Sequence, residues 1–367
     1  MGKHEDKYRI DHHKLIYHPC RVMEWMDAFG EWEKEKSCYP IYMEVSPVGY
    51  CNHHCKFCAL DFLTGKKILL EKELLLKRLQ EFSLLGVKSL MFAGEGEPTL
   101  HPDIAEILDF CTQVKLDTSL TTNFDFSGEE KLQSIMRNCK WIKVSMNGLD
   151  PENYALIHQS SKNSFNRVIN NIEKALEIRG TLQQKCTIGV QLLLLPENAS
   201  GVAVLAKKVK EIGVDYFVVK PYSHHPETIG DTYKDLDYGQ YASLEEELSE
   251  LNSSSFKTVF RFSALNKIQN NLRYYDQCYS VPFFWAYLKS TGDVFGCSCF
   301  LTNKNFCYGN INKQTFREVW ESEERRACIQ YVRNHLNAIE CRLACRMDEI
   351  NRYLWDLKHP NEHVNFI

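Results

Sequence analysis

The sequence lacks the features that mark secreted, membrane-spanning and nucleic-acid-binding chains. Its polar N-terminus, MGKHEDKYRIDHHK, contains no apolar segment of the kind that a secretory signal needs. Its longest apolar run, 188–196, is too short to cross a bilayer. The net charge of −4 at pH 7 gives no strong basic field for nucleic acid or an anionic membrane. We therefore expect a cytoplasmic protein that binds neither nucleic acid nor membranes.

Cysteine is the residue that the chain holds in excess. There are 15 cysteines in 367 residues, and a reducing compartment does not favour disulfides. The thiols are then either buried side chains or metal ligands, and their spacing has to distinguish the two. Three of them, Cys51, Cys55 and Cys58, stand in one short polar stretch, CNHHCKFC.

The middle of the chain alternates between strand-like and helix-like segments. Apolar, β-rich runs predict strands at 41–46, 89–94, 118–123, 141–146, 188–195 and 216–221. Amphipathic runs between them predict helices at 71–85, 103–114, 165–179 and 203–213. Six strand–helix units in a row predict an α/β fold with a parallel sheet, and an open, partial (β/α)6 TIM-like barrel fits them better than a closed eightfold barrel. A doubly wound sheet is the alternative.

The pattern changes after residue 222. The polar, turn-rich stretch 223–241 predicts a linker or lid, and a helix follows at 242–252. Shorter β-like runs then predict a small α+β domain, with a hairpin turn at STGD (290–293) and helices at 317–336 and 347–357. The predicted division is an N-terminal extension at 1–40, a barrel at 41–225, a linker or lid with a helix at 226–255, the small domain at 256–350 and a tail at 351–367.

The polar motifs of the barrel fall directly after predicted strands. CNHHCKFC follows the first, GEGEP (94–98) the second, and SMNG (145–148) and KPYS (220–223) end the fourth and sixth. Because parallel strands of a barrel end at one rim, we expect these motifs to lie together there.

Three thiolates in one loop suit a particular kind of metal site. A [4Fe–4S] cluster usually has four cysteine ligands, so Cys51, Cys55 and Cys58 would leave one iron open to a small molecule. An imidazole of His53 or His54 is an alternative fourth ligand, although a ligand between two ligating cysteines is sterically awkward. Three buried thiols without metal are the other alternative, but so polar a loop buries thiols poorly.

CNHHCKFC resembles the CxxxCxΦC signature of the radical S-adenosylmethionine superfamily, with Phe57 as the aromatic Φ. The resemblance covers about residues 41–225. It implies that Cys51, Cys55 and Cys58 hold a [4Fe–4S] cluster and that S-adenosylmethionine chelates its open iron. Reductive cleavage of this cofactor would then give a 5′-deoxyadenosyl radical.

The other rim motifs extend the resemblance in the same order. GEGEP resembles the glycine–glutamate motif that holds the methionine amino group, which implies cofactor contacts from Gly94, Glu95, Gly96 and Glu97. The motif is one residue longer than the commoner GGEP form, so either glutamate could take that role. SMNG resembles the ribose-contacting segment, with Ser145 as the contact, and VVKPYS (218–223) resembles the segment near the adenine, with Lys220.

A second set of cysteines follows residue 256. Cys278, the run Gly292-x4-Cys297, and Cys341 and Cys345 in CRLAC resemble the C-terminal extension of the SPASM/twitch subgroup. The resemblance implies an auxiliary [4Fe–4S] cluster on those four cysteines, in the shorter, single-cluster twitch form because no cysteine follows. A structural zinc suits four thiolates equally well. The remaining cysteines are expected to be small buried hydrophobic residues: Cys20, Cys38, Cys111, Cys139, Cys186, Cys299, Cys307 and Cys328. Cys299 and Cys307 are also alternatives for a place among the auxiliary ligands, and the glycine spacing favours Cys297 over Cys299.

The resemblance implies an enzyme whose radical abstracts hydrogen from a substrate. The auxiliary cluster could accept an electron, and a flavodoxin- or ferredoxin-like partner would supply the reductant. We expect a small polar metabolite such as a sugar, cyclitol or nucleotide sugar, because about 40 residues before the first strand are too few for a leader-peptide-binding domain. A peptide-modifying maturase and a non-catalytic iron–sulfur or zinc protein are the alternatives. No catalytic acid or base can be named, although His224 or His225 could donate a proton.

Overall fold

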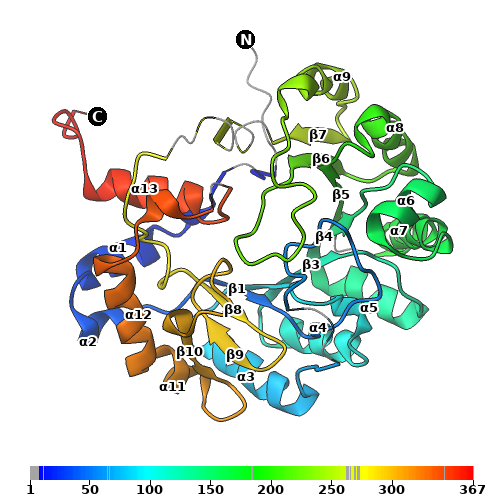
Figure 1. Ribbon diagram of the computed structural model, residues 1–367. Coiled ribbons are helices and arrows are strands. Elements are labelled where there is room, and N and C mark those ends of the chain that lie inside the picture. Colours follow the sequence, from blue (N-terminus) through cyan, green and yellow to red (C-terminus); the bar gives the residue numbers. More distant parts are fainter. Residues whose placement is uncertain are drawn as a thin grey trace.

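The computed structural model describes residues 8–10, 12–63, 65, 67–182, 185–261, 264, 266–267, 270, 273–342 and 344–366. Its centre is one sheet with the strand order β10-β9-β8-β1-β2-β3-β4-β5-β6-β7, curved around a lumen (Figure 1). The strands are β1 (Tyr42–Val45), β2 (Ser89–Phe92), β3 (Asp117–Thr122), β4 (Cys139–Ser145), β5 (Thr187–Leu194), β6 (Tyr216–Pro221), β7 (Lys257–Phe260), β8 (Trp285–Leu288), β9 (Asp293–Phe295) and β10 (Cys307–Asn310).

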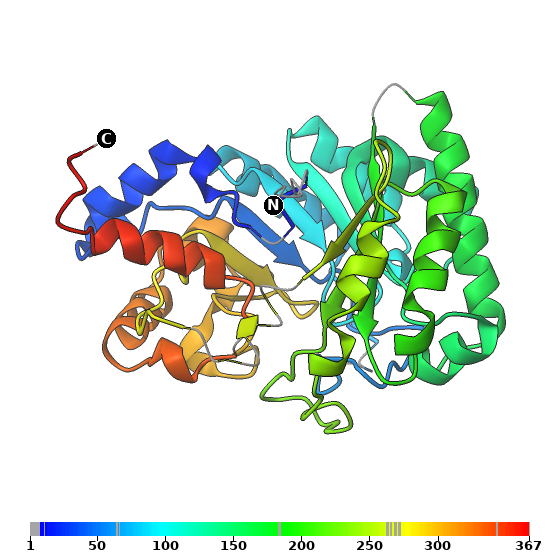
Figure 2. The same ribbon diagram turned by 90° about the horizontal axis from the view of Figure 1, so that it is seen from above.

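Helices cover the outer face of this sheet (Figures 1 and 2). The described helices are α1 (Pro19–Ala28), α2 (Trp32–Glu35), α3 (Lys72–Leu84), α4 (Ile104–Gln113), α5 (Glu129–Asn138), α6 (Pro151–His158), α7 (Asn163–Thr181), α8 (Val202–Ile212), α9 (Leu244–Ser249), α11 (Phe316–Trp320), α12 (Glu323–Asn334) and α13 (Asp348–Lys358).

The alternation of side chains along the strands explains why a lumen forms. On β4, Ile142 and Val144 are fully buried in the main hydrophobic core, whereas Lys143 and Ser145, which alternate with them, are only partly buried. Successive side chains of a strand point to opposite faces, so the apolar set packs under the helices and the polar set faces the inside of the barrel.

The predicted partial barrel is confirmed. All six predicted strands are present, and β1 to β6 pair in sequence order and in parallel. The four predicted barrel helices correspond to α3, α4, α7 and α8. The sequence analysis did not foresee α5 or α6.

The sheet continues past both edges of the predicted barrel. β7 pairs in parallel with β6, and β8 pairs in parallel with β1. The predicted hairpin at STGD is present, since β8 and β9 are antiparallel and Tyr287 pairs with Phe295. The boundary predicted at residue 256 therefore falls just before a strand that belongs to the sheet of the barrel, and the other predicted domain limits stay predictions.

The single helix predicted at 317–336 is wrong. The chain forms two helices, α11 and α12, separated at Glu321 and Ser322. Ser322 has an extended backbone, and its hydroxyl accepts a hydrogen bond of 3.1 Å from the Arg325 amide. A serine in this role caps a new helix N-terminus, and this local signal outweighs the continuous amphipathic pattern.

A second, smaller core joins the two ends of the chain. Val22 and Trp25 of α1 pack with Phe283, Phe284 and Leu354, so the N-terminal helices lie against α13 (Figures 1 and 2). The aromatic run 283–288 is thus core, with Trp285 at 2% exposure.

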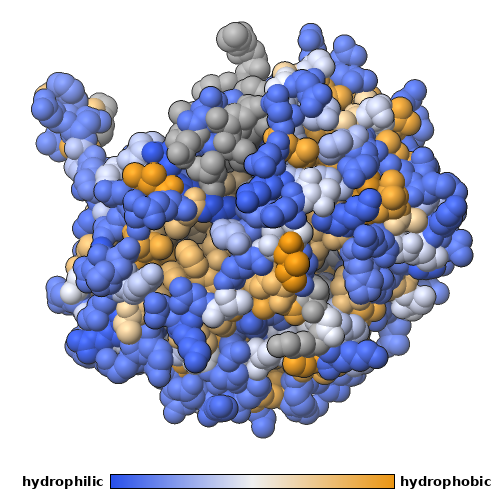
Figure 3. Space-filling model, in the orientation of Figure 1, coloured by the Kyte–Doolittle hydropathy of each residue, from blue (hydrophilic) through white to orange (hydrophobic). Residues whose placement is uncertain are grey.

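Within the described part of the chain, no helix combines the length and the apolar character needed to cross a bilayer. On the face of Figure 3, hydrophilic residues predominate and hydrophobic ones form separate small patches.

Candidate functional site

The first cysteine loop lies directly after β1 and is fixed by its backbone. The amides of His54 and Lys56 donate to the carbonyls of His158 and Ile157, both at 3.1 Å. The loop therefore rests on the C-terminal end of α6. Its three cysteines are all partly buried, and Phe57 packs into the hydrophobic core at 9% exposure.

Nitrogen donors surround the sulfur of Cys51. The His53 amide donates to Cys51 Sγ at 3.4 Å, and Asn123 Nδ2 lies 3.7 Å from the same sulfur. Burial and the nearby Glu97 carboxylate raise the pKa of the Cys51 thiol to about 12. A thiolate here needs positive charge to compensate it, and iron bound to the three thiolates would supply that charge.

His158 contacts Cys55 in a defined tautomer. The Asn147 amide donates to His158 Nε2 at 3.1 Å, so Nε2 is the acceptor. A neutral ring then carries its proton on Nδ1, which lies 3.2 Å from Cys55 Sγ. Burial holds the pKa of His158 well below its usual range, which favours this neutral form. His158 can therefore donate a hydrogen bond to a Cys55 thiolate.

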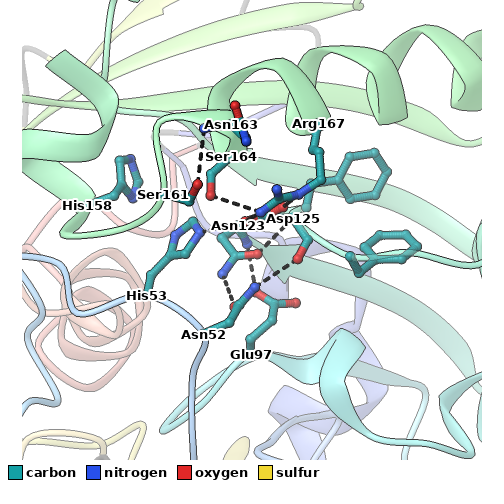
Figure 4. A network of polar contacts seen from close by, with 12 residues as sticks. Asn52, His53, Glu97, Asn123, Asp125, His158, Ser161, Asn163, Ser164 and Arg167 are labelled. Carbon is teal, nitrogen blue, oxygen red and sulfur yellow. Dashed lines mark hydrogen bonds and ion pairs between the residues drawn. The ribbon is translucent and has the colours of Figure 1, made fainter. Parts of the chain in front are cut away.

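A buried carboxylate, Asp125, ties this region together (Figure 4). It lies 3.1 Å from His53 Nε2 and accepts two hydrogen bonds from Arg167, at 2.6 and 2.9 Å. Burial alone would raise the pKa of Asp125, but the hydrogen bonds from His53 and Arg167 outweigh it and hold the pKa well below its usual range. The Asp125 carbonyl also accepts from Asn52 Nδ2 at 2.8 Å, so the network fixes the cysteine loop.

The two histidines of the loop have different environments. His53 is buried and its Nε2 is engaged by Asp125, while His54 is exposed to solvent. His53, Cys55 and His158 place ligand atoms within 4.8 Å of one another. His158, not foreseen from the sequence, is nevertheless the imidazole that contacts a thiol directly.

The two glutamates of GEGEP point to different places. The Glu97 carboxylate accepts hydrogen bonds from the Thr99 amide at 3.0 Å, the Thr122 hydroxyl at 2.6 Å and the Asn123 amide at 2.7 Å. It thus joins the ends of β2 and β3 beside Cys51. Glu97 is the glutamate that lies against the cysteine loop.

Glu95 faces the β8–β9 turn instead. Its carboxylate accepts from the amide and hydroxyl of Ser290, and Lys289 Nζ lies 3.8 Å away. Burial raises the pKa of Glu95. Gly96 between the two glutamates is required sterically, since a Cβ there would lie 2.1 Å from the Tyr50 carbonyl oxygen. The backbone of GEGEP therefore runs in contact with the cysteine loop.

The SMNG motif supplies structure as well as a candidate contact. Ser145 is partly buried at the end of β4. Asn147 is fully buried and its side-chain oxygen accepts from the Leu193 amide at 2.6 Å, which joins the ends of β4 and β5. A Cβ on Gly148 would lie 2.2 Å from the Tyr154 backbone, so glycine lets α6 approach closely. Lys220 lies on β6, one residue before its end.

Five thiols line one cavity in the C-terminal part. They are the four predicted ligands and one more: Cys278, Cys297, Cys341, Cys345 and Cys299. The other lining side chains are mostly apolar, among them Val281, Phe300 and Phe306. A cavity of thiols with apolar walls fits an iron–sulfur cluster.

Nitrogen donors also approach the sulfurs of this cavity. The Met347 amide donates to Cys345 Sγ and Asn351 Nδ2 to Cys278 Sγ, both at 3.4 Å. Cys299, the alternative to Cys297 in the sequence, also lies here, and its thiol interacts with those of Cys297 and Cys345. Cys307 is not among the described residues that line the cavity. Cys299 is thus a fifth candidate ligand.

The loop after β6 connects the two cysteine sites. Asp61, next to the first cluster of cysteines, accepts hydrogen bonds from the Ile229 amide at 3.0 Å and the Gly230 amide at 3.1 Å. The Glu227 amide donates to His225 Nδ1 at 3.1 Å, so the ring donates from Nε2 to the Ser298 carbonyl at 3.1 Å. The first part of the predicted lid, residues 225–230, is therefore held against both cysteine regions, and His225 is buried.

Comparison with known proteins agrees with this geometry. Residues 45–209 match the family model "Radical SAM superfamily", and residues 278–346 match the model "Iron-sulfur cluster-binding domain" of the SPASM type. A probable GTP 3′,8-cyclase of Saccharolobus islandicus is 32% identical over 141 residues, which cover 37% of this chain and 44% of that protein. The chain thus spans less than half the length of this curated relative.

Solved structures share the fold over most of the chain. The Streptococcus suis SuiB bound to S-adenosylmethionine has a TM-score of 0.64 at 21% identity, covering 88% of this chain and 75% of that one. Native anSMEcpe with bound AdoMet has a TM-score of 0.61 at 19% identity, covering 87% and 95%.

A partial barrel with three cysteines after its first strand, joined to a second cavity of thiols, defines an enzyme class that combines S-adenosylmethionine with iron–sulfur clusters. The chain belongs to the radical SAM superfamily and carries a C-terminal SPASM domain. Its cofactors are the radical SAM [4Fe–4S] cluster, S-adenosylmethionine and the auxiliary iron–sulfur clusters of the SPASM domain.

Proposed function

We propose that this enzyme modifies a peptide by abstracting a hydrogen atom from it. The observation that supports this most is the extent of the shared fold. The likeness to SuiB bound to its precursor peptide SuiA covers 88% of this chain, and that to anSMEcpe with bound Cp18Cys peptide covers 87%. The likeness to a GTP 3′,8-cyclase covers 37%. The expectation of a small polar metabolite is therefore the second candidate.

The first site would hold its cluster on Cys51, Cys55 and Cys58, with Glu97 and the GEGEP backbone beside it. When bound and reduced, the cluster cleaves S-adenosylmethionine and supplies a carbon-centred radical. The chain's own residues position and shield this chemistry. Asp125 and His158 fix the cysteine loop, and the lid anchored on Asp61 limits access of water to the lumen.

The second site would hold an auxiliary cluster on four of the five cavity thiols, Cys278, Cys297, Cys299, Cys341 and Cys345. Its apolar walls exclude water from the thiols. A cluster there could take the electron that remains on a substrate after hydrogen abstraction, which would make the overall reaction an oxidation. A flavodoxin- or ferredoxin-like donor would reduce the first cluster.

Deuterium transfer tests the substrate class. Cells grown in deuterated medium provide an extract that is separated into a peptide fraction and a nucleotide–sugar fraction. Each fraction is added to anaerobic, reconstituted enzyme with dithionite and S-adenosylmethionine, and 5′-deoxyadenosine is analysed by mass spectrometry. We expect deuterium in 5′-deoxyadenosine from the peptide fraction and none with Cys55→Ala. Deuterium from the nucleotide–sugar fraction alone would overturn the peptide proposal.

A further inference from the structure

Five cationic side chains converge on the lumen of the barrel. Lys143 lies on β4, Lys220 on β6 and Arg261 directly after β7, while Arg342 and Arg346 come from the C-terminal segment. Each lysine interacts electrostatically with Arg261 and Arg346, and the two lysines with each other. Residues on or directly after three strands, together with two from a remote segment, thus place positive charge in one region.

The two lysine ammonium groups at the centre have no partner in the described part of the chain. Neither Lys143 Nζ nor Lys220 Nζ has a carboxylate within ion-pair distance or a hydrogen-bond acceptor there. The one carboxylate that interacts with Lys143, Glu44, already forms an ion pair with Arg346. Within the described residues, neither lysine ammonium is therefore balanced by a carboxylate of its own.

The environment makes this imbalance costly. Burial, then the neighbouring arginines, lower the pKa of Lys143 to about 8, and burial and the same cations hold the pKa of Lys220 well below its usual range. Both side chains are partly buried, and a charge that loses part of its hydration is normally compensated by a partner of opposite charge. A ligand with negative charge would remove this penalty.

The remote arginines connect this region to the second site. Arg342 follows Cys341, and Arg346 follows Cys345, two of the thiols that line the auxiliary cavity. Arg342 Nε donates to the Ser223 hydroxyl at 2.9 Å, and Arg346 contacts the Tyr42 hydroxyl at 3.3 Å. The segment that carries those thiols therefore also lines the barrel beside Lys220.

We propose that the lumen binds a negatively charged group of the substrate, a carboxylate or a phosphate, between Lys143 and Lys220. The proposal rests on the proposed function in that it takes the lumen as the substrate site. A peptide would present the side chain of Asp or Glu, or its terminal carboxylate, and a nucleotide would present phosphate. Lys220 then contacts substrate, whereas the family resemblance placed it near the adenine of S-adenosylmethionine.

Anion binding to the reconstituted holoenzyme tests this without turnover. The probes are inorganic pyrophosphate and a tetraglutamate peptide, measured by calorimetry in the presence of saturating S-adenosylmethionine. Lys143→Met and Lys220→Met remove one charge each at similar volume. Lys140→Met is the matched control, because Lys140 lies on the same strand, is exposed and pairs with Asp117 at 3.5 Å.

We expect saturable binding of at least one probe by the wild type and Lys140→Met, and affinity lower by about tenfold or more in Lys143→Met and Lys220→Met. The probe that binds identifies the source of the anion. The melting temperature of the wild type should rise with that probe, and that of the two lumen variants should not.

Two results would overturn the proposal. One is the absence of saturable binding by the wild type, or equal affinity in the lumen variants and Lys140→Met. The other is a loss of S-adenosylmethionine binding in Lys143→Met or Lys220→Met as large as the loss of probe binding, which would assign the cations to the cofactor's own carboxylate. Binding of pyrophosphate without the peptide would support the anion site and argue against a peptide substrate.

Discussion

At the scale of single residues, the hydrogen bond between His158 and Cys55 has the clearest chemical consequence. The Asn147 amide can only donate, so it fixes the acceptor nitrogen of the ring and leaves Nδ1–H directed at the sulfur. Hydrogen bonds to ligating sulfurs stabilise the more negative, reduced state of an iron–sulfur cluster. We therefore propose His158 as a positioning residue that would tune the potential of a cluster bound to Cys55.

Replacing His158 by leucine should lower the midpoint potential of that cluster, because the reduced state loses a hydrogen bond. Glutamine, which keeps an N–H donor, should restore part of the shift. The measurement is a redox titration followed by EPR on protein with equal iron content. Tyr154→Phe is the control, since Tyr154 stacks on the same ring at 4.0 Å but its buried hydroxyl has no hydrogen-bond partner among the described residues. An unchanged potential in His158→Leu would contradict the assignment.

No sequence signal could have identified His158. It lies 103 positions from Cys55, at the end of α6, whose sequence has no clear amphipathic pattern. Asn123 could have been predicted as a site residue, because it ends a predicted strand at the rim where polar residues are expected. Cys297 was preferred to Cys299 because of the glycine spacing, whereas the cavity that contains both thiols forms only in the folded chain.

At the scale of elements, the segment Ser290–Cys299 and the lid are held by contacts between remote parts of the chain. Glu95 of GEGEP accepts from Ser290 in the β8–β9 turn, and His225 of the lid donates to Ser298. These contacts keep the auxiliary thiols in place relative to the first site. The pairing of β7 with β6 and of β8 with β1 has the same non-local character, and this is why the sequence predicted the six local strand–helix units but not the full extent of the sheet.

The lid should loosen when its anchor is removed. In Asp61→Ala, the Ile229 and Gly230 amides lose their acceptor, so their hydrogen exchange should become at least about tenfold faster while the barrel strands keep their protection. Mass spectrometry of hydrogen exchange measures this. Asp231→Ala is the control. It removes an exposed carboxylate of the lid itself, which lies 3.6 Å from His224, and should leave the exchange rates of the Ile229 and Gly230 amides unchanged. Equal exchange in both variants would show that Asp61 does not hold the lid.

The auxiliary cavity makes a stoichiometric prediction. Cys341→Ser should lose about half of the bound iron if the two sites hold clusters of the same kind. Cys307→Ser should retain all of it, because Cys307 is not among the described residues that line the cavity. Iron, sulfide and zinc are measured on anaerobically reconstituted protein. Full iron together with lost zinc in Cys341→Ser would assign the cavity to a structural zinc.

At the scale of the whole molecule, the two ends of the chain are joined through one buried cation. Arg325 of α12 donates to the carbonyls of Trp320 at 2.9 Å, Pro282 at 3.2 Å and Glu35 at 3.3 Å. Burial lowers the pKa of this guanidinium to about 10. The N-terminal segment thus closes the side of the molecule that carries the C-terminal helices. This contact could not be predicted from local sequence patterns, because it joins residues that are 290 positions apart.

Arg325→Met should destabilise the fold by at least about 3 kcal/mol, because several buried carbonyls lose their donor at once. The neighbouring Arg326→Met is the control, since Arg326 forms an exposed ion pair with Glu323 at 3.3 Å and such pairs contribute at most about 1 kcal/mol. Denaturant unfolding of both variants measures the difference. Similar stabilities for the two would contradict the role given to Arg325.

The central claim is that Cys51, Cys55 and Cys58 hold a cluster that cleaves S-adenosylmethionine. It is tested most directly by anaerobic reconstitution, addition of dithionite and S-adenosylmethionine, and measurement of 5′-deoxyadenosine. The wild type and Cys55→Ala are each measured with and without the peptide and nucleotide–sugar fractions. We predict 5′-deoxyadenosine from the wild type and none from Cys55→Ala. Equal amounts of 5′-deoxyadenosine from both proteins would contradict the account. So would its absence from wild type that holds iron and sulfide at both sites, when both the peptide and the nucleotide–sugar fractions are present.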